Sequence, residues 1–362
     1  MRKIRIIHFS PWADRLEDVD TFLRRLPGLD LSRRVTSQDL LAMARLDADW
    51  HGENSRAFAA MQHPEIDFLT ARVTGPGGLI ELAQAKRPGD EEWWLIFEGQ
   101  TPQKLAGVLK KLLPILAHLG VRFAWYAFDE VSRTTTAYQE LAPFLQILIH
   151  DEAPIEVAAK AILPKACLTI HRSWVANLIP FTSPFLEKPE DKIVFLGSKL
   201  GLTDHRKRQI DFLKRAYGQR FVAIHDHSLP VGERNGLNRF KVSLCPEGRK
   251  FLTPAMSRTH TDRPFWSGCL GMIPVSENSQ PGHRLDDLAA SQLIQRYAHG
   301  NLDALKASCD RALAASTEDR RRIYDHFNRH ETVGTVMAEA LYAWERSLTD
   351  SVSRAPAVAA KA

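Results

Sequence analysis

Basic residues in the second half of the chain are placed to bind a phosphate group. Arg263 follows Thr261 and Asp262, a hydroxyl and an acid that are typical of the first residues of a helix. The N–H groups of a helix N-terminus and a guanidinium both bind phosphate oxygens. We therefore predict an anion site around Arg263 and the preceding Thr261.

A second phosphate-binding segment is predicted after the apolar run at 192–196, where backbone N–H groups and basic side chains come together. Its members are Gly197, Ser198, Lys199 and Arg206. The adjacent Lys207 and Arg208 are better explained as a solvated helix face than as ligands.

Two carboxylates belong to the same region. Glu247 stands between Pro246 and Gly248, directly after the alternating run FKVSLC, which predicts a strand that stops abruptly. Glu247 and Asp262 could accept hydrogen bonds from ribose hydroxyls or orient an arginine. For Asp262, an interaction with the helix dipole alone explains the residue equally well.

Acids that follow predicted strands in the first half of the chain are the candidates for a general base. Asp129 and Glu130 end the apolar run RFAWYAF, which places them at the carboxyl edge of a predicted sheet. A cap for the segment at Ser132 is an equal alternative. Glu98 and the pair at 151–152 follow other apolar runs in the same way, so position alone does not select the base.

No metal site is predicted. The His225-Asp226-His227 cluster has metal-like chemistry, but no third histidine at helical spacing and no HExxH motif accompany it. A strand-end loop explains the cluster better. The four cysteines are widely spaced, which predicts reduced thiols rather than a disulfide framework or a thiolate zinc site.

Alternating strands and helices must position these residues. The apolar runs predict strands at 3–9, 92–97, 122–128, 144–149, 167–170, 192–196, 221–224, 240–245 and 272–275. Helical spacing occurs at 15–26, 102–119, 157–161, 204–216, 302–315, 318–327 and 332–348. The Gly-rich stretch at 75–78 predicts a turn before a helix, and Gly268 and Gly271 predict close backbone approach. The strand–helix alternation indicates parallel sheets with right-handed crossovers.

The domain organisation follows from a break in this pattern. The segment PFTSPFLEKPED is rich in proline and charge and interrupts regular structure. We predict a first Rossmann-like domain over 1–180, a linker over 181–191, a second Rossmann-like domain over 192–350, and a disordered tail over 351–362. The fold class is therefore α/β, with two Rossmann-like domains facing a central cleft and a helical C-terminal region.

The segment that runs from 239 to 275 resembles the donor-binding core of GT-B glycosyltransferases. Glu247, then TDRPF from Thr261, then GMIPV from Gly271 are similar to the fucosyltransferase-like group, and the last of these is similar to the exostosin-like group. The resemblance implies transfer of a sugar from a nucleoside diphosphate sugar, with inversion and without a required cofactor or metal. Trp266 stands where the exostosin-like pattern has an acid.

Composition restricts the partners. The 362 residues include 44% hydrophobic and 25% charged residues, as in soluble globular proteins, and the chain begins with a predicted strand rather than a signal peptide. These features predict a cytoplasmic protein, with peripheral contact at an anionic membrane left open. The net charge of +5 favours an anionic partner. The resemblance favours a nucleotide-sugar donor and a glycan or glycolipid acceptor over nucleic acid.

Two alternatives remain at this point. Trp266 and the lack of a distinctive base favour a catalytically silent protein that keeps the fold as a binding module or scaffold. The basic segment HRKRQIDFLKR makes nucleic-acid binding the second alternative, although no recognisable nucleic-acid-binding module accompanies it.

Overall fold

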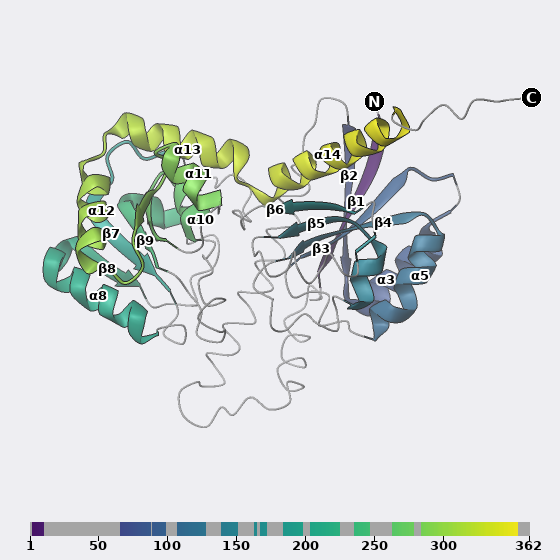
Figure 1. Cartoon of the computed structure of the whole chain (residues 1–362), viewed down its shortest axis with the longest axis horizontal. Coiled ribbons are helices and arrows are strands. Elements are labelled where there is room, and N and C mark those ends of the chain that lie inside the picture. The colour runs from purple at the N-terminus through teal and green to yellow at the C-terminus, as the bar shows by residue number, and fades with distance from the viewer. Residues whose placement is uncertain are drawn as a thin grey trace, which may run out of the picture.

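The computed structural model places the secondary structure of both halves of the chain. It describes residues 2–10, 66–87, 89–98, 107–127, 139–150, 163–164, 167–171, 184–197, 203–224, 235–246, 263–278 and 284–353. Figure 1 shows these residues as two groups of strands and helices. One group is formed mainly by the first half of the chain and the other mainly by the second half.

A six-stranded parallel sheet forms the first domain, in the order β2-β1-β3-β4-β5-β6. Its strands are β1 (Arg2–Ser10), β2 (Ile66–Thr74), β3 (Glu92–Glu98), β4 (Val121–Ala127), β5 (Leu145–His150) and β6 (Leu168–His171). Trp94, Phe123 and Ile147 are fully buried in adjacent strands of this sheet. Near-continuous apolar runs of this kind are expected where helices cover both faces of a parallel sheet.

The first-domain helices are α3 (Gly75–Ala85), α5 (Val108–His118) and the short 3-10 turn η1 (Ala142–Phe144). Leu79, Leu109 and Leu113 lie on the buried faces of α3 and α5 and join one core with Trp93 and Trp125. The Gly-rich stretch predicted as a turn before a helix instead forms the first turn of α3 itself.

A five-stranded parallel sheet forms the second domain, in the order β11-β10-β9-β7-β8. Its strands are β7 (Glu190–Leu196), β8 (Phe221–Ile224), β9 (Phe240–Cys245), β10 (Ile273–Glu277) and β11 (Gln295–Tyr297). In each sheet, the strand that comes first in the sequence (β1 or β7) pairs on one side with the next strand in the sequence. All later strands lie on its other side. This is the doubly wound arrangement in which ligands bind outside the carboxyl ends of the two strands where the order reverses.

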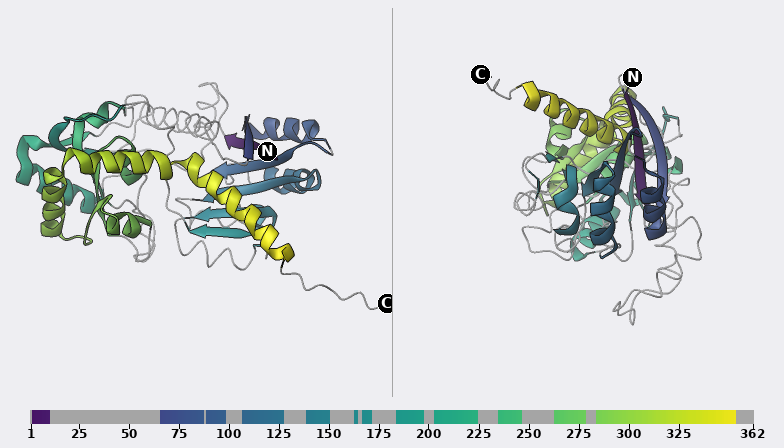
Figure 2. Two further views of the ribbon diagram at one scale, coloured as in Figure 1. Left: turned by 90° about the horizontal axis from the view of Figure 1, so that it is seen from above. Right: turned by 90° about the vertical axis from the view of Figure 1, so that its right-hand side faces the viewer.

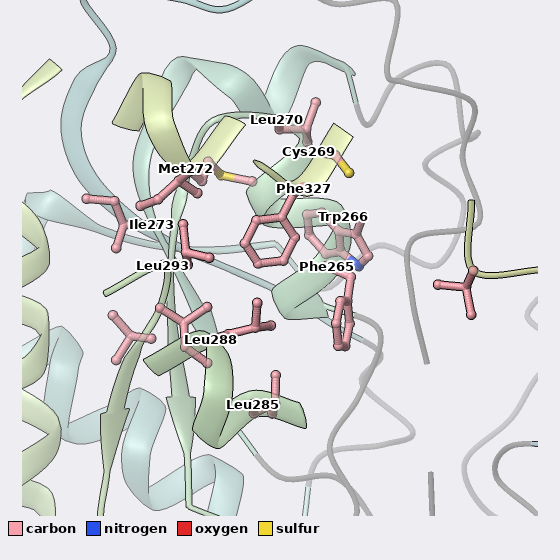
Figure 3. Packing of buried hydrophobic residues seen from close by; sticks show 14 of the residues in the cluster. Phe265, Trp266, Cys269, Leu270, Met272, Ile273, Leu285, Leu288, Leu293 and Phe327 are labelled. Atoms are coloured by element: carbon pink, nitrogen blue, oxygen red, sulfur yellow. The ribbon is translucent and has the colours of Figure 1, made fainter. Parts of the chain in front are cut away.

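The second domain also contains helices. They are α8 (Asp204–Tyr217), α10 (Arg263–Cys269), α11 (Arg284–Ala290), α12 (Leu302–Ala314) and α13 (Thr317–His330), with 3-10 turns η2 (Gly218–Arg220) and η3 (Asn235–Arg239). Of these, α8, α10 and α12 contact the strands and α13 packs on α10. The helix α10 is buried along most of its length, and Figure 3 shows Phe265 and Trp266 beside Phe327 of α13. Phe265 and Trp266 are core residues, because they are 0% and 3% exposed.

The last helix, α14 (Val333–Ser353), leaves the second domain and runs along the first. It contacts β5. Trp344 packs edge-on against Trp94 of β3 with ring centroids 4.9 Å apart, and the guanidinium of Arg122 lies 4.4 Å from the Trp344 ring centre. The chain therefore crosses between the domains twice, and its C-terminal helix contributes to the core of the first.

Most of the predicted elements in the described ranges are confirmed to within six residues at each end, as is the α/β class with two Rossmann-like domains. The sequence did not predict β2 or β11, and the C-terminal region is less uniformly helical than expected because β11 completes the second sheet. Glu190 and Asp191, assigned to the linker, begin β7. The helix α14 continues to Ser353, three residues into the predicted tail.

The predicted helices at 15–26 and 157–161 lie outside the described residues. The exact domain limits, the remaining linker and tail, and the central cleft between the domains stay predictions. No helix in the described part of the chain is long and apolar enough to cross a membrane.

Candidate functional site

Polar residues gather at the carboxyl edge of the second sheet. β7 ends at Leu196 and β9 at Cys245, and these two neighbouring strands lie where the order of the sheet reverses. The helices α8 and α10 both begin near this edge, since α8 follows β7 and Arg263 of α10 bonds to the end of β7. Gly197, Arg206 and Arg263 therefore lie where the topology expects a ligand.

Arg263 is fixed at the end of β7. Its Nε donates to the carbonyl oxygen of Leu196 at 2.7 Å, and its guanidinium lies 5.5 Å from the centre of the Phe195 ring. A methyl group at Gly197 would meet the Phe195 ring at 2.5 Å and Nη2 of Arg263 at 3.1 Å. Gly197 is thus required for the close approach of the arginine to the strand end.

Arg206 lies in the first turn of α8 and is only 5% exposed. The turn is held by Thr203, whose hydroxyl accepts the backbone N–H of Arg206 at 3.2 Å. Burial, together with the positive charge of Arg263, lowers the pKa of Arg206 to about 9, while Glu277 and Tyr297 oppose this shift. The two guanidinium groups therefore repel each other, and an anion bound between them would relieve that repulsion.

Glu277 ends β10 and is completely buried. Its Oε1 accepts the backbone N–H of Gly300 at 2.9 Å and the side-chain N–H of Gln209 at 3.0 Å, and it lies 2.7 Å from Nε2 of His205. Burial alone would raise the pKa of Glu277, but these hydrogen bonds and the charge of His205 outweigh it and lower the pKa. A buried carboxylate near Arg206 therefore keeps its negative charge.

The structure brings together three of the predicted site residues, namely Gly197, Arg206 and Arg263. The others lie outside the described residues and stay predictions: Asp129, Glu130, Ser198, Lys199, Glu247, Gly248, Thr261 and Asp262. The chain enters the two segments with predicted carboxylates from the carboxyl ends of β4 at Ala127 and of β9 at Cys245. Lys207 and Arg208 are exposed, as the solvated alternative predicted.

Several polar residues of this edge were missed from the sequence: His205, Gln209, Glu277, Tyr297 and His299. A signal for Glu277 was present, because the run MIPVSE is a buried strand that ends in an acid, the same pattern that selected Glu247. For the others no local pattern exists, since α8, β10 and β11 bring them together over nearly a hundred residues of sequence.

Comparison with known proteins adds structural neighbours and no sequence relatives. No protein-family model matches the chain, and no curated protein matches it significantly. The lipopolysaccharide outer core galactosyltransferase WaaB in its apo form aligns with a TM-score of 0.45 and 10% identity, covering 96% of this chain and 99% of that one. Spinosyn rhamnosyltransferase SpnG with thymidine diphosphate aligns with a TM-score of 0.42 and 10% identity, covering 94% and 100%.

A third neighbour is the pneumococcal O-GlcNAc transferase GtfA with UDP and GlcNAc, at a TM-score of 0.39 and 8% identity, covering 76% of this chain and 59% of that one. Likeness at these scores does not assign a shared site or activity. What the chain's own coordinates establish is two parallel, doubly wound α/β domains, with buried Arg206 and Glu277 and two partly exposed histidines at the carboxyl edge of the second.

Proposed function

We propose that the protein is a GT-B-type glycosyltransferase that moves a sugar from a nucleoside diphosphate sugar to a hydroxyl of a glycan, glycolipid or other acceptor. The observation that carries the proposal is the pair of arginines, Arg206 and Arg263, beside Gly197 at the reversal point of the second sheet. Two buried or half-buried cations at this edge suit a diphosphate better than a neutral ligand.

The proposed reaction begins with proton removal from the acceptor hydroxyl. Asp129 or Glu130, which follow β4 in the sequence, takes this proton, and the acceptor oxygen attacks the anomeric carbon from the face opposite the leaving group. The bond between that carbon and the diphosphate oxygen breaks, and the configuration inverts. Because the proposed base lies in one domain and the phosphate residues in the other, the domains must bring the two substrates together.

Charge that develops on the departing diphosphate has to be stabilised. In this proposal Arg263, Arg206 and Lys199 compensate it, with the backbone N–H groups at Gly197 and Ser198, so that the transfer itself needs no metal. Glu247 and Asp262 bind ribose hydroxyls or orient Arg263, while Gly248 and Thr261 shape the loop and the start of α10. In this proposal the second domain binds the donor and the first domain binds the acceptor.

A catalytically silent scaffold with the same fold is the second candidate. Trp266 supports it, because this residue is buried in the core at the place where the exostosin-like pattern has an acid. A nucleotide site without turnover would be expected in that case. The proposed cytoplasmic location and contact with an anionic membrane apply to either candidate.

Calorimetric titration with GDP, UDP, ADP and dTDP, and with the matching monophosphates, tests the nucleotide site. We expect at least one diphosphate to bind, and to bind more tightly than its monophosphate, because the arginine pair recognises the second phosphate. Thermal shift supplies an independent readout, since a ligand at one hundred times its Kd adds about 2.7 kcal/mol of stability.

Arg263→Ala should weaken diphosphate binding at least tenfold, since removing a charged hydrogen-bond partner of a phosphate costs about 1.5 to 3 kcal/mol. Arg208→Ala is the matched control, because Arg208 lies on the exposed face of α8. Equal loss in the two variants, or no binding of any nucleotide by the folded protein, would contradict the proposal. Nucleotide binding without sugar transfer or donor hydrolysis, across a panel of sugar nucleotides, would favour the scaffold.

A further inference from the structure

A second cluster at the same edge consists of His205, Glu277 and His299. One potential ligand atom from each of the three lies within 4.8 Å of the others. Nε2 of His205 is 2.7 Å and Nδ1 of His299 is 3.2 Å from Oε1 of Glu277. The imidazole rings are stacked, with centroids 4.6 Å apart and an angle of 19° between their planes.

These residues come from three separate elements. His205 is in the first turn of α8, Glu277 is the last residue of β10, and His299 follows the end of β11. The carboxylate is fully buried, whereas the His205 and His299 side chains are 25% and 43% exposed. An ion could therefore reach the cluster from solvent on the histidine side, with the glutamate forming the floor.

Hydrogen bonding around the carboxylate fixes its orientation. The hydroxyl of Tyr297 donates to Oε1 of Gln209 at 3.1 Å, which turns the side-chain N–H groups of Gln209 toward Glu277. Gly300 donates a backbone N–H to the same carboxylate at 2.9 Å. Outer contacts of this kind hold metal ligands in place in proteins.

The same orientation creates a conflict at His205. The amide nitrogen of Gln209 lies 2.9 Å from Nε2 of His205, so this ring nitrogen accepts a hydrogen bond if it carries no proton. Its lone pair then faces both carboxylate oxygens of Glu277, at 2.7 and 3.0 Å. If Nε2 instead carries a proton and donates it to Glu277, it cannot accept from Gln209. A cation between Nε2 and the carboxylate would occupy the lone pair of Nε2, and Gln209 would then donate to Glu277 alone.

We propose that His205, Glu277 and His299 bind one divalent transition-metal ion of the zinc class. Two imidazoles and one carboxylate are a common ligand set for zinc when a fourth position stays open to water or a ligand. Ligand atoms about 2.0 to 2.2 Å from a tetrahedral ion are about 3.4 Å from one another. The two distances from Oε1 in the cluster, 2.7 and 3.2 Å, need only small side-chain movements to reach this spacing.

The metal site is distinct from the arginine pair. None of its three ligands is one of the two arginines, although Arg206 follows His205 in the chain. The metal site does not require that the protein transfer sugars, and metal binding can be measured without nucleotide.

Zinc titration of chelator-treated protein against a competing chromophoric chelator, at pH 7.5, tests the site. We expect one zinc per chain in the wild type. The double variant His205→Ala/His299→Ala should bind at least tenfold more weakly. Glu277→Gln keeps the size of the side chain and an acceptor oxygen but removes the negative charge, so it should also weaken zinc binding by at least tenfold.

The matched control is His326→Ala/His330→Ala. These rings are also neighbours, 5.1 Å apart, and Nε2 of His326 lies 3.4 Å from the buried Glu331. This control should keep wild-type zinc affinity, and circular dichroism should show that every variant is folded.

Three outcomes would overturn the proposal: no zinc bound by the wild type, unchanged affinity in both the double variant and Glu277→Gln, or zinc binding that is lost in His225→Ala/His227→Ala but kept in the double variant. Nucleotide titrations of the same proteins without zinc separate this result from the proposed function, because the arginine pair is intact in all of them.

Discussion

At the scale of single residues, the second domain depends on close approach between α10 and α13. Gly268 of α10 has no side chain, and a methyl group built there would lie 2.4 Å from ring atoms of Phe327. Gly271, at the end of the same helix, has a φ of 72°, which L side chains rarely adopt. Both glycines were predicted to permit close backbone approach. The position of Phe327 beside Gly268 confirms this, as does that of Phe185, which a methyl group at Gly271 would meet at 2.9 Å.

Gly268→Ala should therefore reduce the free energy of unfolding by about 1 to 3 kcal/mol, because the added methyl group overpacks a filled core. In the double variant Gly268→Ala/Phe327→Leu, a smaller side chain replaces the opposing ring, and this should recover part of the lost free energy of unfolding. Urea denaturation of the two single variants and the double variant measures the coupling. Strictly additive effects would show that the methyl group and the ring do not compete for the same space.

At the scale of elements, the helix α13 begins with a reciprocal cap. The hydroxyl of Ser316 accepts the backbone N–H of Asp319 at 3.0 Å, and the Asp319 carboxylate accepts the backbone N–H of Ser316 at 3.1 Å. The hydrogen bonds from the side chain and then the backbone of Ser316 lower the pKa of Asp319. A Ser-x-x-Asp sequence before an apolar stripe is a local signal for a helix start.

Ser316→Ala should destabilise the protein by about 1 kcal/mol at pH 7, the usual cost of removing a helix cap. The Asp319 contribution should depend on pH. Because its folded pKa lies below the unfolded value of about 3.9, the stabilisation is complete above that value and is lost as pH falls through the folded pKa. The stability difference between wild type and Asp319→Ala should thus narrow from pH 7 toward pH 3. A difference that stays constant over this range would argue against an ionised cap.

At the scale of the whole molecule, α14 joins the two domains. Figures 1 and 2 show it extending from the second domain along the sheet of the first. Its Trp344 is 5% exposed and packs between Trp94 and Arg122, which also pairs with Glu92 of the same sheet. A chain that is continuous through the second domain thus completes the core of the first.

Trp344→Ala should destabilise the first domain by about 3 to 5 kcal/mol, the range for removing a large buried aromatic side chain. Hydrogen exchange should quicken in β3, β4 and β5 and stay unchanged in β9 and β10. Arg346→Ala, at an exposed position of the same helix, is the control and should have little effect. Faster exchange confined to the second domain would show that the helix does not stabilise the first.

The sequence by itself determined most of the described elements and part of the site. Long apolar runs such as those at 92–97 and 192–196 predicted strands because a strand buried on both faces has few polar positions. Arg206, Arg263 and Gly197 were found because each stands at a strand end or helix start, where local chemistry is visible. The strand β11 was missed because its three residues carry no clear period, and β2 because polar residues interrupt its apolar run.

The tertiary structure alone decided which of these ends meet. Glu277 and His299 come together because β10 and β11 are parallel neighbours, with Glu277 opposite Tyr297, and His205 joins them because α8 begins at the same edge. No sequence spacing encodes this contact, which depends on strand order. The packing of Trp344 on Trp94 is likewise non-local, because the helical period predicts that a residue is buried but not the surface against which it packs.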